Sequence, residues 1–543
     1  MVFARRSTTL LAAIIASCAM VLSLTACTSD NKTVVDGQTT VTSNSAGGVA
    51  VFTPSDGITL NQQMPLNKWA KLVPDLTKAL VDAGFKKGDI NHTTSDSLDK
   101  QSRAIQDFVV DHLSNNTTDD SGIAIAPDNM TLLVAPVVEA DASTRQYGDY
   151  VSQNLSTNDV TDEGATSDGE SSEDDSSKDD SSNTESDSTA SDEQAQAVDR
   201  LVSSLKLAKE SGMHVVLLGN SIEGYKPDAF VKFSDAQTIG KLQAEKMVSK
   251  LKLDKASKDN PKYIEVLLPY TAVDEKGNAN DSTFAQEAFR GIWQVLGSYY
   301  QKGVVESPSG TLDGKSTEND WQAVAYDAAK EGSTAKVLDK RLAKTDGQST
   351  LTRIDGIITM NDYIASEVVK ELDDLGYTGS AADINPQITI SGIVGNITGK
   401  KDLSRDAVPD PIKSPENDNA NDSSSSDDDV DEDTSASDKD RDSQWPLVTG
   451  YGAYVSNIPS IVNGKQWMTG MEDRQTIATD IAQACAKLNK DEALNSMPSI
   501  RNSEVGGVKK IPTISEPLLA VSASNLKSAL IDPGYISLAD AGL

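Results

Sequence analysis

The sequence predicts an α/β protein with two lobes, each built on a parallel sheet that helices cover on both faces. Strand-like and helix-like segments alternate along the chain, which is typical of this class. The alternation forms two successive series, which indicates two lobes. Two stretches rich in serine and aspartate, residues 161–193 and 416–442, interrupt the series with net charges of −12 and −10. Because they hold almost no apolar residues, we expect both to be disordered insertions.

The N-terminus has the features of a secretion signal. Two arginines precede an apolar stretch at residues 10–22, which is too short to cross a bilayer. The stretch leads to Leu24-Thr25-Ala26-Cys27, which resembles a bacterial lipobox. We therefore expect residues 1–26 to be a lipoprotein signal peptide, Cys27 to be lipidated and residues 27–48 to be a flexible tether. The alternative is an ordinary secretion signal with a chance cysteine.

The first series of alternating segments starts at an apolar strand, residues 49–52. Apolar residues then recur at helical spacing from Trp69 to Ala83, and Gly84 ends this helix. The remaining segments of the series are a helix at 101–113, a strand at 122–126, a helix that starts at 131–140 and resumes at 197–211, strands at 215–218 and 230–233, and a helix at 239–251.

The second series repeats the pattern. Its segments are a strand at 263–268, helices at 284–300 and 321–343, a strand at 354–360, a helix at 363–375, and strands at 388–393 and 447–449. In open α/β sheets, ligands bind beyond the carboxyl ends of the strands. The residues that directly follow each strand are therefore the candidates for a binding site.

Four segments, in their order along the chain, resemble the sugar-binding proteins of ABC importers. They are residues 230–235 with 240–244, residues 359–365, residues 461–469, and the tail at 512–514 and 531–535, and they are most similar to the xylose and multiple-sugar group. The resemblance implies two Rossmann-like lobes that are joined by three crossing strands and that close on a ligand by a hinge motion.

The resemblance also implies the lobe boundaries. We expect an N-terminal lobe of residues 49–235 and 468–514, with a disordered insertion at about 141–196. The C-terminal lobe then consists of residues 236–467 and 515–543, with a disordered insertion at about 405–444.

Candidate ligand-binding residues follow from sugar chemistry and from the resemblance. Proteins hold a pyranose with an aromatic ring on its C–H face and with polar side chains at its hydroxyls. The resemblance implies that Trp69 stacks on the sugar and that Asn361 and Asp362 bind hydroxyls, so Asp362→Ala is expected to abolish binding while leaving the fold intact. Asp128 follows a predicted strand and is a further candidate. The alternatives are a core position for Trp69 and helix capping for Asn361, Asp362 and Asp128.

Other positions depart from the family pattern. Asn220 and Ser221 lie at positions where the group has an acid and an arginine. Phe284 lies where the group has an asparagine, and Tyr451 lies where the group has a glutamine–aspartate pair. Charged or amide contacts have thus become neutral or aromatic. The identity of the sugar stays open, and the alternatives are a less polar ligand, an oligosaccharide held by stacking, or no ligand at all.

Several function classes have little support in the sequence. The formal net charge of −33 argues against nucleic acid as a partner. The three histidines lack the spacing of a metal site, and we expect no metal and no cofactor. Beyond the signal and Cys27 only Cys485 remains, so no intrachain disulfide is expected. Because acidic pairs are abundant, a glycosidase remains an alternative function. Its two carboxyl groups would need a defined separation, which the sequence does not show.

Together these observations predict a solute-binding lipoprotein rather than an enzyme. We expect it to capture a small molecule, a carbohydrate by resemblance, and to dock as a monomer on the membrane permease of an ABC importer. The lipid at Cys27 would hold it on the extracytoplasmic face of the cell membrane. The alternative is a surface interaction or sensory protein that keeps the fold without transport.

Overall fold

The computed structural model describes residues 34–35, 38–39, 46–55, 65–115, 125–138, 144–150, 153–156, 185–273, 280–343, 351–382 and 443–543. The chain divides into two compact units, Met1–Asn44 and Ser45–Leu543. In the first unit, strands β1 (Val34–Val35) and β2 (Gln38–Thr39) pair in antiparallel fashion. The expected signal peptide and Cys27 lie outside the described residues. Within the described ranges, no helix has the length and apolar character needed to span a bilayer.

The second unit contains two large sheets, of which the first has seven strands in the order β17-β18-β9-β7-β5-β3-β4. Neighbouring strands run parallel throughout, except that β17 is antiparallel to β18. In chain order the strands are β3 (Gly48–Pro54), β4 (Ile90–Ser95), β5 (Met130–Val134), β7 (His214–Leu218), β9 (Ala229–Val231), β17 (Ile500–Val505) and β18 (Val508–Ile514).

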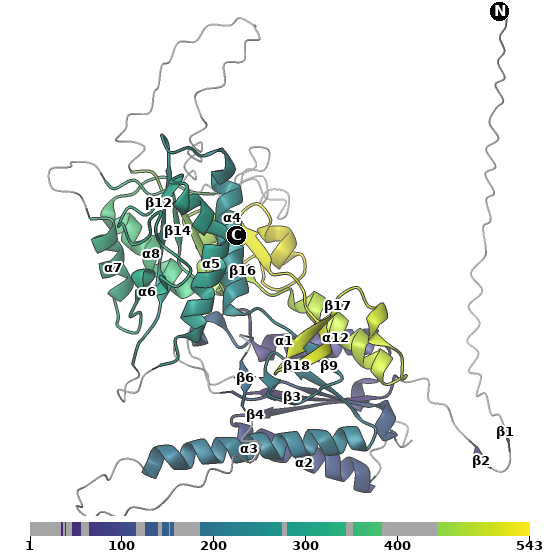
Figure 1. Cartoon of the computed structure of the whole chain (residues 1–543). Helices are drawn as coiled ribbons and strands as arrows, with labels where there is room; N and C mark the ends of the chain where they lie inside the picture. Colours follow the sequence, from purple (N-terminus) through teal and green to yellow (C-terminus); the bar gives the residue numbers. More distant parts are fainter. Residues whose placement is uncertain are drawn as a thin grey trace, which may run out of the picture. The chain divides into compact units, whose positions relative to one another are not determined.

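Helices cover both faces of this sheet (Figure 1). Along β3, Val49 and Val51 belong to one apolar core, while Ala50 and Phe52 belong to another, as the twofold period of a strand requires. The first core contains residues of α1 (Trp69–Asp82) and α12 (Arg474–Leu488), and the second contains residues of α2 (Leu98–Asn115) and α3 (Glu185–Glu210). This sheet and its helices form the first lobe.

The second large sheet has six strands in the order β12-β10-β14-β15-β16-β19. All neighbours run parallel except β19, which is antiparallel to β16. The strands are β10 (Lys262–Val266), β12 (Val305–Glu306), β14 (Gly356–Ile358), β15 (Leu447–Tyr451), β16 (Met468–Met471) and β19 (Leu519–Ser522). This sheet and its helices form the second lobe.

The sheet of the second lobe is likewise covered on both faces. Ile358 of β14 packs with α4 (Ala236–Leu251) and α5 (Thr283–Gln301), whereas Ile357 packs with α7 (Ser333–Arg341) and α8 (Asp362–Leu375). The remaining elements are α6 (Trp321–Val324), α11 (Ile458–Val462), and two small parallel pairs, β11 (Leu268–Pro269) with β13 (Ala325–Tyr326) and β6 (Asn154–Leu155) with β8 (Ser221–Ile222).

The chain passes between the two lobes three times. It leaves the first sheet after β9, returns to it after β16, and leaves it again after β18. The crossing segments are residues 232–235, 472–473 and 515–518. The predicted α/β fold, with two parallel-sheet lobes joined by three crossings, is confirmed by this topology. Strand β16 pairs within the six-stranded sheet, so the second crossing follows Met471 rather than residue 467.

Two predictions on local structure are wrong. The helix expected to start at 131–140 is instead strand β5, whose five residues are all buried. A short apolar run buried on both faces has no periodicity that separates it from a buried helix. Within the insertion expected at about 141–196, residues 144–150 and 153–156 have defined positions, and α3 begins at Glu185. The strand expected at 388–393, the acidic stretch at 416–442 and residues 161–184 of the first acidic stretch lie outside the described residues.

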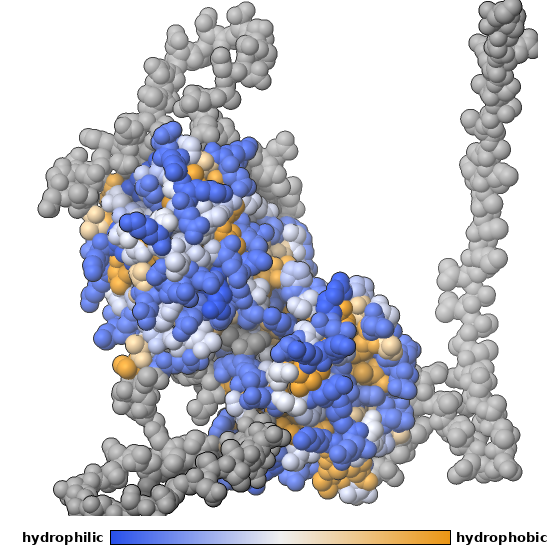
Figure 2. All heavy atoms as spheres, in the orientation of Figure 1, coloured by the Kyte–Doolittle hydropathy of each residue, from blue (hydrophilic) through white to orange (hydrophobic). Residues whose placement is uncertain are grey.

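The visible surface matches this two-sided packing. It is predominantly hydrophilic, with hydrophobic residues singly or in small groups (Figure 2). Most large apolar side chains lie in the cores on the two faces of each sheet. We therefore expect a binding site at the ends of the strands rather than on an exposed apolar face.

Candidate functional site

Side chains from both lobes meet at the carboxyl ends of the strands. Asn361 follows β14, Tyr451 ends β15, and Phe284 is the second residue of α5, while Trp69 begins α1 in the first lobe. The segment Thr144–Tyr150 contacts all four of these residues. We call the four residues Trp69, Phe284, Asn361 and Tyr451 the strand-end site.

The two loops of the second lobe at this site have unusual backbone conformations. Met360, between β14 and Asn361, has a φ of 68°, and Ala453, just after β15, has a φ of 50°. A residue with a Cβ in the left-handed region costs about 1–2 kcal/mol. Both residues are fully buried, so packing holds these loops in place. Strained residues of this kind concentrate at binding and active sites.

Asn361 has two roles at the strand-end site. Its Oδ1 accepts a hydrogen bond from the Ile364 amide at 2.9 Å, which caps helix α8. Its Nδ2 donates to Gln146 Oε1 at 3.1 Å. The capping alternative and a polar contact across the site are therefore both present in one side chain.

Asp362 is buried beneath the site and binds neighbouring loops of its own lobe. Its carboxylate accepts hydrogen bonds from the Tyr454 amide (2.9 Å), Gln466 Nε2 (2.7 Å) and Thr469 Oγ1 (2.9 Å). Burial raises the pKa of Asp362 to about 6, and these hydrogen bonds oppose the rise. Because its acceptor oxygens are already used, we infer that Asp362 positions the loop after β15 and the residues that lead into β16.

Trp69 lies in the core of the first lobe, where its side chain is 3% exposed. Its ring makes edge contacts with Tyr150 at 5.0 Å and with Phe233 at 5.7 Å between centroids. Its backbone amide donates to Asp149 Oδ2 at 3.0 Å. The Trp69 ring is thus buried against residues of the same chain, which favours the alternative that it is a core residue.

Phe284 and Tyr451 both contact one side chain, that of Tyr147. The Tyr147 ring is 4.6 Å from the Phe284 ring and 6.2 Å from the Tyr451 ring between centroids. Tyr147 and Tyr451 are each 1% exposed, and Phe284 is half-buried. Burial raises the pKa of the Tyr147 and Tyr451 phenols, so both hydroxyls stay protonated at neutral pH.

Asn220 and Ser221 contact the chain just beyond this segment. Asn220 Nδ2 donates to the Pro136 carbonyl at 2.9 Å, and Asn220 Oδ1 accepts from the Gln153 amide at 3.0 Å. Ser221 Oγ donates to Asn154 Oδ1 at 2.8 Å. Both residues therefore hold residues 153–154 against the first lobe.

Asp128 is not part of the strand-end site. It precedes β5 in a short 3₁₀ turn, at the amino ends of the strands, and is exposed. Its carbonyl accepts a hydrogen bond from His214 Nε2 at 3.1 Å, and His214 is the first residue of β7. The expectation that Asp128 follows a strand is wrong because the strand is Met130–Val134 rather than 122–126.

Glu472 is a buried acid that the sequence reasoning missed. It lies in the second crossing segment, and its Oε1 accepts from the Ser234 amide of the first crossing at 2.7 Å and from the Tyr451 hydroxyl at 3.4 Å. Burial raises the pKa of Glu472 to about 7, and the negative charge of Asp235 adds to the rise. Glu472 thus connects two of the three segments about which a hinge motion would occur.

The residues that contact the strand-end site were also missed, namely Gln146, Tyr147, Asp149 and Tyr150. They lie within the range expected to be a disordered insertion. The signal available was compositional, because 146–150 contains two tyrosines and a glycine, whereas residues 161–193 contain no aromatic residue.

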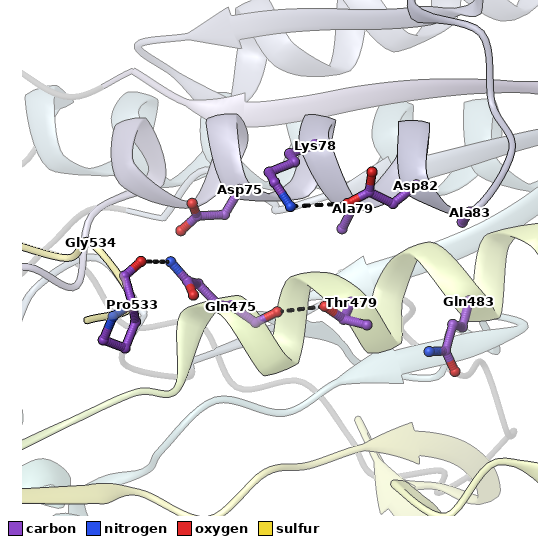
Figure 3. Close-up of a pocket in the computed structure, with 10 residues that line it drawn as sticks. All are labelled: Asp75, Lys78, Ala79, Asp82, Ala83, Gln475, Thr479, Gln483, Pro533 and Gly534. Carbon is purple, nitrogen blue, oxygen red and sulfur yellow. Dashed lines mark hydrogen bonds and ion pairs between the residues drawn. The ribbon is translucent and has the colours of Figure 1, made fainter. Parts of the chain in front are cut away.

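A surface groove lies elsewhere, between α1 and α12 of the first lobe (Figure 3). Its volume is about 660 Å³, and its lining includes Asp75, Lys78 and Gln475. Gln475 Nε2 donates to the Pro533 carbonyl at 2.8 Å, and Lys78 pairs with Asp82 at 3.0 Å. The groove contains none of the strand-end residues, so we do not assign it to ligand binding.

No protein-family model and no curated protein matches the chain. Similar solved structures include a solute-binding protein of an ABC transporter from Clostridium phytofermentans with bound β-D-glucose, at 17% identity and a TM-score of 0.44, covering 91% of this chain and 99% of that one. A carbohydrate transporter solute-binding protein from Chloroflexus aurantiacus in complex with D-glucose has 17% identity and a TM-score of 0.44, covering 92% and 98%. A periplasmic ribose ABC transporter protein from Conexibacter woesei has 13% identity and a TM-score of 0.42, covering 90% and 96%. Likenesses at this level do not establish the family of this chain.

Proposed function

We propose that this protein is an extracytoplasmic solute-binding protein that captures a small carbohydrate for an ABC importer. The observation that supports the proposal is the meeting of side chains from both lobes at the strand ends, with three crossing segments between the lobes. Two lobes connected in this way can open and close on a ligand by a hinge motion. Affinity would come from burial of the ligand between them, without covalent chemistry.

The side chains at the strand-end site suit the surface of a sugar. Phe284 and Tyr451 offer aromatic rings for an apolar C–H face, and Asn361 Nδ2 offers a donor for a hydroxyl. A neutral hydrogen bond of this kind contributes about 0.5–1.5 kcal/mol. Specificity would therefore depend on shape and stacking more than on charged contacts, which fits the neutral replacements noted in the sequence.

We also propose that the protein is anchored in the cell membrane through a lipid on Cys27 and acts as a monomer. The lipobox-like motif that ends at Cys27 supports the anchor. The monomer is supported by the fact that one chain supplies side chains to the strand-end site from both lobes. Mass spectrometry of the N-terminal peptide purified from membranes tests the lipid directly.

The sugar proposal is tested by thermal shift and titration calorimetry on the full chain with D-glucose, D-ribose, L-arabinose and D-xylose. A ligand at about 100 times its dissociation constant stabilises a protein by about 2.7 kcal/mol. We expect at least one sugar to raise the melting temperature. Phe284→Ala should weaken that binding, whereas Asp128→Ala, at the opposite end of the strands, should leave it unchanged.

The alternative is a surface interaction or sensory protein that retains the fold without transport. It is favoured by one observation, which is that side chains of Thr144–Tyr150 occupy the strand-end site. If the folded protein responds to none of the sugars, and Phe284→Ala behaves like Asp128→Ala, the transport proposal fails and this alternative replaces it.

A further inference from the structure

The segment Thr144–Tyr150 is bound on one side to the second lobe. Gln146 Oε1 accepts a hydrogen bond from Asn361 Nδ2 at 3.1 Å, and the Gln146 carbonyl accepts one from the Tyr454 hydroxyl at 2.6 Å. Asn361 follows β14 and Tyr454 follows β15, so both bonds reach the carboxyl ends of the second sheet. These are the positions where a ligand of an α/β lobe is expected to bind.

The same segment is bound on its other side to the first lobe. The Asp149 carboxylate accepts hydrogen bonds from Lys68 Nζ at 2.7 Å and from the Trp69 amide at 3.0 Å. The Asp149 amide donates to the Asn67 carbonyl at 2.8 Å, and the Tyr150 hydroxyl donates to the Lys68 carbonyl at 2.5 Å. The segment therefore connects the two lobes, as a bound ligand would.

Tyr147 lies at the centre of the segment, and its ring contacts the rings of Phe284 and Tyr451. Its side chain is a six-membered ring with a hydroxyl, similar in size to a pyranose. It belongs to the apolar core of the second lobe, although it precedes that lobe by about ninety residues in the chain. Tyr147 thus takes up the position that the proposed sugar would need.

We propose that Thr144–Tyr150 is a built-in occupant of the strand-end site, which a sugar must displace in order to bind. The inference rests on the proposed function. When only a fraction of the molecules is in the binding-competent state, the apparent dissociation constant equals the intrinsic one divided by that fraction. The segment therefore sets the affinity of the protein for its ligand, and Tyr147 is the residue whose contacts determine it.

The contacts of the occupant leave one buried polar group, the Tyr147 hydroxyl, poorly satisfied. The Tyr147 hydroxyl is buried and has no hydrogen-bond partner of good geometry among the described residues, although its interaction with the Asn361 side chain opposes the rise of its pKa. A buried polar group without a partner weakens the state that buries it. Tyr147→Phe removes this cost, so it should strengthen the occupied state and weaken sugar binding.

Gly148 offers the opposite perturbation. It has a φ of 98°, and a Cβ added there would lie 2.5 Å from the Asn67 carbonyl oxygen. Gly148→Ala should therefore release the segment without removing any side chain that lines the site. Gly224 has a comparable φ of 69° but no atom within 4 Å of an added Cβ, so Gly224→Ala is the matched control for the backbone effect.

The test is calorimetric titration of the full-chain wild type and the three variants with D-glucose and L-arabinose. We expect Gly148→Ala to bind about tenfold more tightly than wild type and Tyr147→Phe about tenfold more weakly, a factor that corresponds to about 1.4 kcal/mol in each direction. Gly224→Ala should match wild type. Sugar binding with equal affinity in all four proteins would overturn the inference and leave the proposed function in place.

Hydrogen–deuterium exchange measures whether the segment is docked in the absence of sugar. Peptides that contain the Trp69 and Asp149 amides should exchange slowly in wild type and faster in Gly148→Ala, because both amides donate across this contact. Fast exchange of both amides in wild type would show that the segment is not docked and would overturn the inference. Slow exchange in wild type together with no sugar binding by any variant would instead overturn the proposed function, while the occupancy of the site would stand.

Discussion

Replacing Glu472 with glutamine should stabilise the protein at high pH and leave its stability unchanged at low pH. Glu472 is 1% exposed, and its Oε1 accepts hydrogen bonds from the Ser234 amide and the Tyr451 hydroxyl. A glutamine has the same shape and keeps one acceptor oxygen for these two donors. The substitution therefore removes the buried charge with little change in packing.

The size of the effect follows from the pKa. Burial raises the pKa of Glu472 from 4.5 to about 7, and one pKa unit is equivalent to about 1.4 kcal/mol. Between these two pH values the unfolded chain releases the proton while the folded protein retains it, so the free energy of unfolding falls as the pH rises. Above pH 7 the buried charge of Glu472 lowers the free energy of unfolding by the full amount of about 3 kcal/mol, and below pH 4.5 it has no effect.

The assay is urea unfolding of wild type and Glu472→Gln, followed by tryptophan fluorescence at pH 4.5 and pH 8. We expect the variant to exceed the wild type by up to about 3 kcal/mol at pH 8 and to equal it at pH 4.5. Glu245→Gln, on the exposed side of α4, is the control and should show no such dependence. A difference between Glu472→Gln and wild type that is the same at both pH values would refute the reasoning.

Two further predictions concern the second lobe and the acidic insertion. Asp362→Ala should lower the free energy of unfolding by about 3 kcal/mol or more. The reason is that three buried donors lose their acceptor, at a cost of about 1–3 kcal/mol each. An unchanged midpoint of urea unfolding would contradict the positioning role of Asp362. Deleting residues 161–184 should leave sugar affinity unchanged, since this stretch has no aromatic residue and almost no apolar ones to line a site. If calorimetry detects weaker sugar binding after the deletion, these residues have a role beyond that of a spacer.

Much of the fold could be predicted because local patterns carry it. The helical spacing of apolar residues from Trp69 onward predicted α1, whose buried residues are Trp69, Leu72, Leu76 and Leu80. The alternation of strands and helices predicted two parallel sheets, which the topology confirms. The prediction failed at β5, because an apolar run buried on both faces has no periodicity to distinguish strand from helix.

The site was predictable only in part. Asn361, Phe284, Tyr451 and Trp69 were located from strand ends and from the family resemblance, and the structure brings them into one group through their contacts with the segment at 144–150. The role of Asp362 could not be read in advance, because its three donors come from residues about ninety to one hundred positions later in the chain. Asp128 was misplaced together with the strand that it was thought to follow.

The amino-acid sequence by itself determined the class of the fold, the two lobes and the residues that end the strands, because these depend on apolar periodicity and on turn residues that are close together in the chain. Only the tertiary structure decided what fills the space between those strand ends. Tyr147 contacts Phe284 and Tyr451 across more than one hundred intervening residues, and Glu472 contacts Ser234 across a similar distance. Contacts between residues so far apart depend on how the whole chain packs, and no local pattern encodes them.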